Sequence, residues 1–298
     1  MSATTTKSYW LHALSPLHVG AGRGLGHIDL PIVREKTTHW PYVPGSAVKG
    51  VLADHHGASD EASRKEEALK KLAFGLGGDN EAAAGALVFT DARLVCLPVQ
   101  SFFGTFAWCA SPLVLRNLKR DLEAAGMQTP PLPVDRGSDS PWAALSETSL
   151  LAPKGKIYLQ DLDCDASADA AATEWARFLG KKLFADDEEW QKIFAERFAI
   201  ISNDLFDYLC VLGTQVDARI RIDGEKGTVA TGGLWYEESL PAETILAGLV
   251  WCDSNRIGQP EAEKLLQRFA TDQALIQVGG KATVGRGRVG LSFADETR

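Results

Sequence analysis

Glycine occupies every second position from residue 20 to residue 26, and this segment constrains the fold more than any other. Four glycines in seven residues would lose too much conformational entropy in a helix or a strand, so the segment must be a loop. A second glycine-rich segment, residues 279–287, lies near the other end of the chain and carries Lys281 and Arg286. Bare backbone N–H groups and cations together suit phosphate oxygens, although a tight turn between strands is the alternative.

Charge is distributed unevenly along the chain. The formal net charge is −8, which argues against a generally basic nucleic-acid-binding protein. Residues 1–50 nevertheless hold five basic residues and two acidic ones, and residues 276–290 hold three basic residues and no acidic one. If the two ends meet in space, an acidic protein still presents a basic groove. A chance distribution of charge is the alternative.

The composition is that of a soluble globular protein, with 45% hydrophobic and 23% charged residues among 298. This length predicts one elaborated domain or two fused ones. The longest apolar run, Ile245–Cys252, is far shorter than the roughly 20 residues of a membrane helix, so we expect no membrane partner. Five cysteines without a CxxC pair, and an N-terminus without a signal pattern, predict a reduced, cytoplasmic protein.

Hydrophobic periodicity and turn residues predict strands and helices in irregular alternation. The predicted strands are Ser8–Leu14, Ala86–Leu97, Ile157–Leu162 and Arg288–Phe293. The predicted helices begin at Ser46, Ser111-Pro112 and Pro260 or span Ala62–Leu72, Thr173–Phe184 and Glu188–Phe198, while Pro130–Pro141 is a surface loop. Connections of such varied length exclude a barrel of eight units. They favour an α+β fold with an antiparallel sheet and helices on one side.

Several common active sites are absent from the sequence. No serine lies in a GxSxG pattern, so there is no nucleophile elbow. Neither glycine-rich segment fits the GxGxxG or GxxxxGK[ST] pattern of a nucleotide-binding loop. The run that begins at Asp161 lacks the glycine and the final acid of a calcium loop, and no His/Cys spacing fits zinc.

Residues 44–50 combine a helix start with a hydroxyl and a cation. Ser46 is the expected N-cap, and Lys49 lies in the first turn. A helix N-terminus suits a phosphate, and a cation there is unfavourable to the helix dipole unless an anion is near. Phosphate binding is one reading of Lys49, and a solvated lysine is the other.

Residues 218–231 predict a β-hairpin with a basic face. Arg219 and Arg221 alternate with Ile220 and Ile222, so the two arginines share one face of a strand. Residues 223–227 form a turn, and residues 228–231 a return strand. The hairpin either protrudes from the protein or belongs to an ordinary sheet with a solvated face.

Together these segments resemble the RAMP superfamily of CRISPR effector proteins, and within it the repeated, RNA-cutting backbone subunits of type III-B (Cmr) complexes. The matching segments keep the order found in the family over nearly the whole chain. They are residues 15–20, 28–35, 44–50, 85–101, 219–222, 233–241 and 276–287. Residues 130–165 match poorly, and no role is transferred to them.

The resemblance implies a fold. The core would be an RRM-like ferredoxin fold, called the palm, within a single RAMP domain that spans residues 1–298. A protruding β-hairpin, the thumb, would occupy about residues 214–231, beside smaller helical insertions. The first and last strands would be neighbours, which would bring the two basic ends of the chain together.

The resemblance also implies partners and site residues. Copies of the protein would stack helically along one guide RNA, next to other CRISPR effector subunits, and complementary target RNA would pair with the guide. Asp29 matches the cleavage acid, His18 the histidine of the same family, and Glu237 and Tyr236 would be neighbours in the catalytic site. The residues expected to bind RNA are Ser46, Lys49, Arg219, Arg221, Lys281, Arg286 and Arg288.

The implied chemistry is consistent with these residue types. RNA carries its own nucleophile, the 2′-hydroxyl, which an enzyme needs only to orient and deprotonate. Asp29 would act as the base or would help to hold a divalent cation, expected to be Mg²⁺, together with phosphate and water. His18 is either a general acid or a structural or phosphate-contacting histidine.

Two functions therefore remain open. One is a guide-dependent endoribonuclease that is also the backbone of the complex. The other is a non-catalytic, structural RNA-binding subunit of the same kind of complex. Asp29 favours the first, because a carboxylate gains nothing electrostatically beside RNA in a protein that only binds. A nucleotide-using enzyme of another kind is a third reading, against which the missing phosphate loops count.

Overall fold

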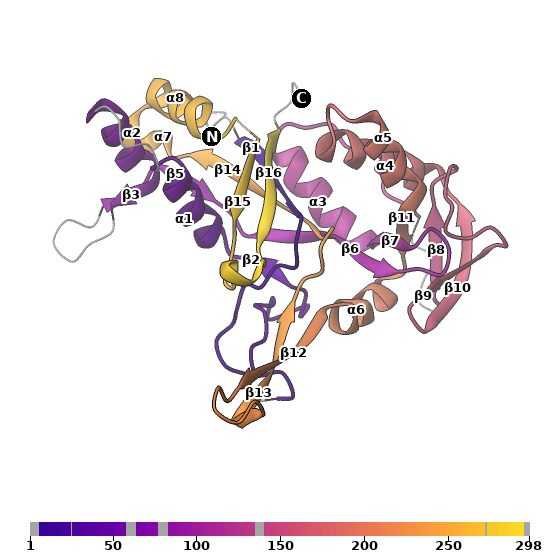
Figure 1. Cartoon of the computed structure of the whole chain (residues 1–298). Helices are drawn as coiled ribbons and strands as arrows, with labels where there is room; N and C mark the ends of the chain where they lie inside the picture. Colours follow the sequence, from indigo (N-terminus) through magenta and orange to yellow (C-terminus); the bar gives the residue numbers. More distant parts are fainter. Residues whose placement is uncertain are drawn as a thin grey trace.

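The computed structural model describes residues 6–24, 26–57, 64–76, 83–134, 140–271 and 273–294. They form a mixed α+β fold around one large sheet (Figure 1). Its strands are β1 (Thr6–Ala13), β2 (Tyr42–Val43), β5 (Leu87–Phe89), β6 (Ala92–Gln100), β7 (Phe106–Ala110), β8 (Trp142–Leu145), β9 (Lys156–Leu159), β10 (Leu162–Ala168), β11 (Phe198–Ile201), β14 (Ile245–Cys252), β15 (Ala274–Gln277) and β16 (Arg288–Ala294).

The described helices are α1 (Gly45–His55), α2 (Arg64–Phe74), α3 (Pro112–Ala124), α4 (Ala170–Leu183), α5 (Glu188–Arg197), α6 (Asn203–Leu212), α7 (Ser254–Ile257) and α8 (Gln259–Phe269). A 3₁₀ turn covers Ala282–Val284, and β3 (Gly75–Leu76) pairs with β4 (Ala83–Ala84). None of these helices is long and apolar enough to cross a membrane.

The first and last strands of the sheet are hydrogen-bonded neighbours. β1 lies between β16 and β14 and is antiparallel to both, and β15 forms the edge beyond β16. The strands predicted at Ser8–Leu14 and Arg288–Phe293 are confirmed to within two residues at each end. The two basic ends of the chain are therefore brought together, as the family resemblance implied.

The sheet is mixed, so the expectation of a purely antiparallel sheet is wrong. β11 pairs parallel to β7, and β10 pairs parallel to β8. Between β7 and β11 the chain runs through several helices and a hairpin, and such long connections allow a strand to return in the same direction.

The helices cover both faces of the sheet, which corrects the expectation of one covered side. Successive residues of β1 point to opposite faces. Tyr9 and Leu11 pack in a core with Val48 of α1 and Leu265 of α8. Trp10 packs in a second core with residues of α3, α4 and α5. Two hydrophobic layers therefore hold the sheet from opposite sides.

The strand predicted at Ala86–Leu97 is two strands, β5 and β6, because Thr90 and Asp91 between them are hydrogen-bonded to β1 and α1. The hydroxyl of Tyr9 donates to the carbonyl of Thr90 at 2.5 Å. The Asp91 carboxylate accepts from the backbone N–H of Gly45 at 2.8 Å. Likewise, the strand predicted at Ile157–Leu162 is divided by a turn at Gln160, whose φ is +50°.

The hydrogen bond between Asp91 and Gly45 also corrects the predicted start of α1. The helix begins at Gly45, the N-cap position is Pro44, and no side chain caps it from that position, so Ser46 is not the N-cap. Gly45 is required here because a Cβ would lie 2.4 Å from the carbonyl oxygen of Phe89. The helix therefore starts in direct contact with the β5–β6 link, and Asp91 supplies the cap.

Other predicted helices are confirmed with small shifts of their ends. Ser111 caps α3 by accepting from the N–H of Val114, and Leu115, Leu118 and Leu122 are buried as expected. Pro260 stands in the first turn of α8, whose buried residues include Leu265, Leu266 and Phe269. Part of the predicted loop at Pro130–Pro141, residues 135–139, lies outside the described residues.

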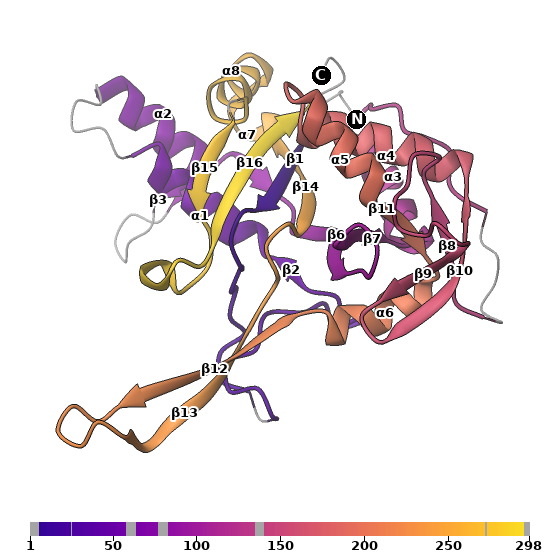
Figure 2. The ribbon, with the colours of Figure 1, turned by 45° about the vertical axis from the view of Figure 1, so that its right-hand side comes forward.

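The predicted hairpin is present and extends away from the sheet (Figure 2). It consists of β12 (Gln215–Ile222) and β13 (Val229–Ser239), paired antiparallel. Its second strand is longer than predicted, since it ends at residue 239 instead of 231. Arg219 stands opposite Trp235, and Asp217 stands opposite Glu237, so these four side chains share one face.

We predict that Asp91→Ala lowers the free energy of unfolding by about 1 kcal/mol, because α1 loses its cap. Chemical denaturation of the purified protein measures this change. Asp186→Ala is the control, since Asp186 is exposed and exposed substitutions change stability by within about 0.5 kcal/mol. Equal stability of the two variants would contradict the proposed role of Asp91.

Candidate functional site

Three segments that are distant in sequence meet at the base of the hairpin. They are residues 16–32, which include the first glycine-rich loop, the end of β13, and the second glycine-rich loop. Gly280 N–H donates to the carbonyl of His18 at 2.9 Å, and Gly287 N–H donates to the carbonyl of Pro16 at 2.9 Å. Leu30 forms a parallel bridge with Glu237. We call this meeting point the loop junction.

Asp29 is exposed and is held by backbone on two sides. Its Oδ2 accepts a hydrogen bond from the N–H of Tyr236 at 2.8 Å, and its carbonyl accepts from the N–H of Gly24 at 2.9 Å. The other carboxylate oxygen, Oδ1, has no partner among the residues that the structure describes. The fold thus presents one oriented carboxylate oxygen to solvent.

Asp29 lies in the wall of an open groove of about 400 Å³ between the first glycine-rich loop and the hairpin. The residues that line this groove come from all three segments of the loop junction. They are Arg23, Gly24, Asp29, Leu30, Gly232, Leu234, Trp235 and Lys281. An acid and two cations therefore share one surface hollow, beside small residues that leave room for a ligand.

Glu237 is buried and gathers the cations near the groove. Its Oε1 accepts from Lys281 Nζ at 2.8 Å and from Trp235 Nε1 at 2.7 Å, and its Oε2 lies 3.4 Å from Arg219 Nε. Burial raises the pKa of Glu237, but the hydrogen bonds from Lys281 and Trp235 and the charges of Lys281 and Arg219 outweigh burial, so the pKa lies below its ordinary value. Glu237 is thus a carboxylate near neutral pH and positions Lys281.

The side chain of Tyr236 is 41% exposed, while that of its neighbour Glu237 is buried, because successive residues of a strand point to opposite faces. Tyr236 therefore reaches Asp29 through its backbone. His18 is buried, and its Nδ1 lies 2.6 Å from the carbonyl oxygen of Glu238. A carbonyl only accepts, so Nδ1 carries the proton. This geometry favours a structural role for His18 over that of a general acid.

Comparison with known proteins agrees with this architecture. A family model described as the RAMP superfamily matches residues 10–290. This chain belongs to the RAMP superfamily. The resemblance inferred from the sequence is therefore confirmed.

The RAMP protein is also similar to individual members of the superfamily. It is 33% identical over 292 residues to the CRISPR system Cmr endoribonuclease Cmr4 of Pyrococcus furiosus, covering 96% of this chain and 95% of that protein. The crystal structure of oligomeric Cmr4 from Pyrococcus furiosus matches with a TM-score of 0.76 and 26% identity, over 99% of this chain and 100% of that chain.

A third match is a chain of the type III-B Cmr-beta complex bound to cognate target RNA, solved by cryo-EM. It aligns with a TM-score of 0.75 and 19% identity, over 97% of this chain and 96% of that chain. At this identity the match shows a shared fold. The mixed α+β architecture of the RAMP protein is therefore that of known Cmr subunits.

Two residues that are expected to contact RNA also make contacts within the RAMP protein. Arg286 is buried and forms an ion pair with Asp217, at the base of β12. This pair joins the second glycine-rich loop to the hairpin, and an RNA contact from the Arg286 side chain stays a prediction. Lys49 donates to the carbonyl of Leu87 at 2.7 Å, and burial, followed by the nearby charge of Arg256, lowers the pKa of Lys49.

The remaining candidates differ in exposure. Ser46 is exposed in the first turn of α1 and does not line the groove at the loop junction. Arg221 and Arg288 are also exposed, and Lys281 and Arg219 are partly exposed beside Glu237. The loop junction therefore brings together Asp29, His18, Tyr236, Glu237, Lys281 and Arg219, whereas Ser46 and Lys49 belong to α1.

Sequence analysis missed Glu238 and Arg34, which hold the loop junction together. Glu238 Oε1 lies 2.5 Å from Arg34 Nη2 and accepts from the hydroxyl of Thr214 at 2.9 Å. Its Oε2 accepts from the N–H of Ile32 at 3.0 Å. Only the burial of Glu238, 2% exposed, reveals this role, and the sequence Glu237-Glu238 offers no signal that separates the two acids.

No group of three or more His, Cys, Asp or Glu side chains among the described residues forms a metal site. At the groove, Asp29 alone supplies a carboxylate oxygen, next to two cations. This donor set does not hold Mg²⁺ by itself, because Mg²⁺ takes six oxygen ligands. Phosphate and water oxygens would have to complete its shell.

The five cysteines are free and buried.

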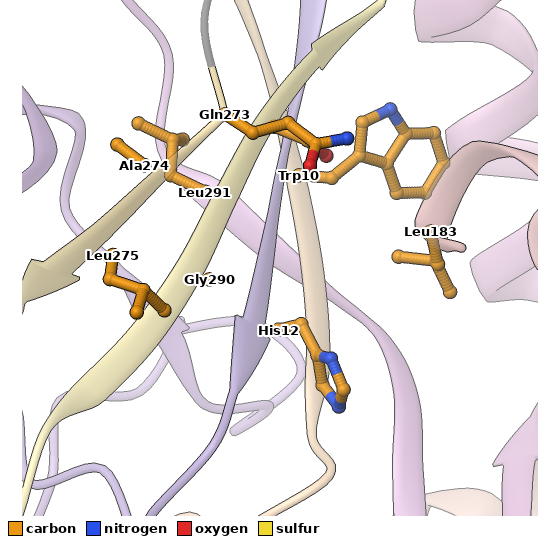
Figure 3. Close-up of a pocket in the computed structure, with 9 residues that line it drawn as sticks. Trp10, His12, Leu183, Gln273, Ala274, Leu275, Gly290 and Leu291 are labelled. Atoms are coloured by element: carbon orange, nitrogen blue, oxygen red, sulfur yellow. The ribbon is translucent and has the colours of Figure 1, made fainter. Parts of the chain in front are cut away.

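A second hollow, of about 210 Å³, lies on the sheet where Trp10 and His12 of β1 face Leu275 and Gly290 (Figure 3). His12 Nε2 lies 2.7 Å from Glu243 Oε2 at this hollow. None of the site residues predicted from the sequence lines it. Asp29 and Lys281, by contrast, line the first groove.

We predict that Glu237→Gln lowers the melting temperature at neutral pH and that this difference disappears in acid. The lowered pKa means that Glu237 contributes stability above its ordinary pKa, and this contribution is lost as the pH falls through the lower folded-state pKa. The difference between the two proteins should thus start to shrink near the ordinary glutamate pKa of about 4.3 and vanish below the folded-state pKa. Glu225→Gln, at the exposed hairpin turn, is the control, and a difference that persists unchanged to pH 3 would refute the ion-pair role.

Proposed function

We propose that this RAMP protein is a guide-RNA-binding backbone subunit of a type III-B CRISPR interference complex and that it cuts complementary target RNA. The observation that carries the proposal is the orientation of Asp29, whose carboxylate is fixed by the Tyr236 N–H in a groove lined by cations. The name of the relative from Pyrococcus furiosus states an endoribonuclease activity, which the proposal extends to this chain.

In the proposed reaction, the 2′-hydroxyl of the target attacks the neighbouring phosphorus. The new bond joins the 2′-oxygen to phosphorus, the bond to the 5′-oxygen breaks, and negative charge grows on the phosphate in between. Asp29 Oδ1 accepts the proton of the 2′-hydroxyl, and water protonates the leaving 5′-oxygen. Lys281, held by Glu237 at 2.8 Å, contributes positive charge where negative charge develops.

The expected Mg²⁺ belongs to this proposal as an addition to the protein residues. Asp29 would contribute one ligand and the RNA phosphate others, since Mg²⁺ is commonly bound through one or two carboxylates together with substrate phosphates. When bound, the cation would neutralise phosphate charge. The assignment of Asp29 as base needs no metal, and cleavage measured with and without a chelator separates the two roles.

The finer description of the fold is part of the same proposal. The order β1, α1, β5–β6, β14, α8, β16 along the chain, with β16, β1, β14 and β6 adjacent in the sheet, fits the β-α-β-β-α-β pattern of an RRM-like ferredoxin palm. The β12–β13 hairpin would be the thumb of a single RAMP domain, and α3 to α6 helical insertions. Copies would stack along the guide in the cytoplasm, beside other effector subunits.

Guide binding in this proposal depends on the RNA backbone. Arg221 and Arg288 are exposed and Lys281 is partly exposed, and all three lie on or near the hairpin and the second glycine-rich loop. Cations that contact phosphates bind without regard to base sequence. Ser46, Lys49 and Arg219 remain predicted RNA contacts.

The alternative is a structural subunit without catalytic activity. The same cations would then hold guide RNA, and Asp29 would serve only to fasten the glycine loop to β13 through the Tyr236 N–H. The exposed Oδ1 of Asp29 favours the nuclease, because a purely structural carboxylate beside RNA would be expected to have both oxygens bonded.

We predict that Asp29→Asn reduces cleavage by roughly 10²-fold or more, because an amide cannot take the 2′-proton. The amide oxygen can still accept from Tyr236 N–H, so the loop should keep its shape. Target binding should be equal or slightly tighter, because a negative charge is removed near phosphates. The measurement is single-turnover cleavage and target affinity of the reconstituted guide complex, with Asp161→Asn as the exposed control.

Normal cutting by the Asp29→Asn complex would eliminate the catalytic assignment and leave the structural subunit as the better function. Loss of binding together with cutting would also contradict it. That outcome would mean that the Asp29 charge shapes the loop.

We predict that the hairpin tip places target RNA and is dispensable for folding. Replacing Asp223–Gly227 by a two-residue Asn-Gly turn, which suits a tight hairpin, leaves the anchors at Asp217, Glu237 and Glu238 intact. The melting temperature should stay the same, while the positions of cleavage along the target shift or broaden. A shortened protein that fails to fold would assign the hairpin to the core, and an unchanged cleavage map would remove its role in placement.

A further inference from the structure

Arg23 shares the wall of the groove with Asp29, and a single glycine explains why. A Cβ on Gly24 would lie 2.2 Å from the backbone oxygen of Ile28, so only glycine lets the two sides of the loop approach this closely. The N–H of Gly24 donates to the carbonyl of Asp29 at 2.9 Å. This bond pairs Gly24 with Asp29, and Arg23 directly precedes Gly24 in the chain.

Arg23 also differs from four other cations of the loop junction and the hairpin base, because those four are bound to carboxylates. Lys281 and Arg219 are bound to Glu237, Arg286 is bound to Asp217, and Arg34 is bound to Glu238. Arg23 has no ion-pair or hydrogen-bond partner within the part of the chain that the structure describes, and its side chain is exposed in the groove. Its guanidinium is therefore available to a ligand.

A guanidinium at this place suits one chemical group in particular. Arginine is always charged and presents a planar fork of N–H donors that matches two oxygens of a phosphate. Without a phosphate, its own charge in the groove is balanced by Asp29 alone among the lining residues. A phosphate bound between Arg23 and Lys281 would stand next to the free Oδ1 of Asp29.

We infer that Arg23 is a catalytic residue of the proposed nuclease, whose guanidinium binds the non-bridging oxygens of the phosphate under attack. This inference rests on the proposed function, since it assigns a second group to the same site. Asp29 takes the proton of the 2′-hydroxyl, and Arg23 stabilises the charge that grows on the phosphate as the 2′-oxygen bond forms and the 5′-oxygen bond breaks.

The test is single-turnover cleavage by reconstituted guide complexes at saturating target RNA, with target affinity measured in parallel. Arg23→Ala should slow cleavage by about 10²-fold, while affinity falls only a few-fold, because one phosphate contact of many is lost. Arg23→Lys keeps the charge without the fork and should recover part of the rate. Arg120→Ala, an exposed arginine on α3, is the matched control and should cut normally.

Target RNA with sulfur in place of one non-bridging oxygen at the cleavage site supplies a readout that a structural role would not move. One of the two sulfur isomers should be cut more slowly by the wild-type complex, and this difference should shrink in Arg23→Ala. Unchanged sulfur sensitivity, or a loss of cleavage that saturating target RNA restores, would make Arg23 a binding residue only and overturn the inference.

Asp29→Asn in the same assay separates this inference from the proposed function. If Asp29→Asn abolishes cutting and Arg23→Ala cuts at the wild-type rate, the inference alone fails. If Asp29→Asn also cuts normally, the nuclease proposal fails with it. Circular dichroism of Arg23→Ala and Arg23→Lys guards against misfolding, and a folded Arg23→Lys protein that cuts at the wild-type rate would contradict the need for the fork.

Discussion

The buried carboxylate of Glu238 is the interaction on which the site depends. It joins Arg34, Thr214 and the N–H of Ile32, so one side chain of β13 fixes both the segment that follows the first glycine-rich loop and the start of the hairpin. Burying an ion pair is costly in desolvation and is weak evidence for stability. The pair instead defines where the two segments lie relative to each other. If they separated, the charge of Arg34 or Glu238 would be left buried without a partner.

The two residues that precede Glu238 on the strand extend this control. Tyr236 fixes Asp29 through its backbone, Glu237 fixes Lys281, and the carbonyl of Glu238 fixes His18. Three consecutive residues thus arrange the acid, a cation and the loop. The exposed groove keeps its shape because its supports lie in the buried base of the hairpin.

Much of the fold was predictable from local pattern, because Leu115, Leu118 and Leu122 follow helical spacing and Arg219–Ile222 alternates as a strand. The errors have physical causes. Ser46 is not the cap because the carboxylate of Asp91, distant in sequence, accepts the N–H of Gly45 at the start of the helix. The strand predicted at Ala86–Leu97 is divided where Asp91 makes this contact. Asp29 and Lys281 could be predicted to share a site through the family resemblance. Glu238 and the Asp217–Arg286 pair could not, because tertiary contacts alone distinguish them from solvated charges.

The central claim is that the groove beside Asp29 receives the phosphate at which target RNA is cut. The most direct measurement is the structure of the guide complex with a target whose 2′-hydroxyl at the cleavage site is replaced by hydrogen, so that the RNA stays intact. The account predicts this phosphate in the groove, within hydrogen-bonding distance of a lining cation, with the 2′-carbon facing Asp29. A phosphate at the cleavage site that lies outside the groove, for example beside Lys49 on α1, would contradict it.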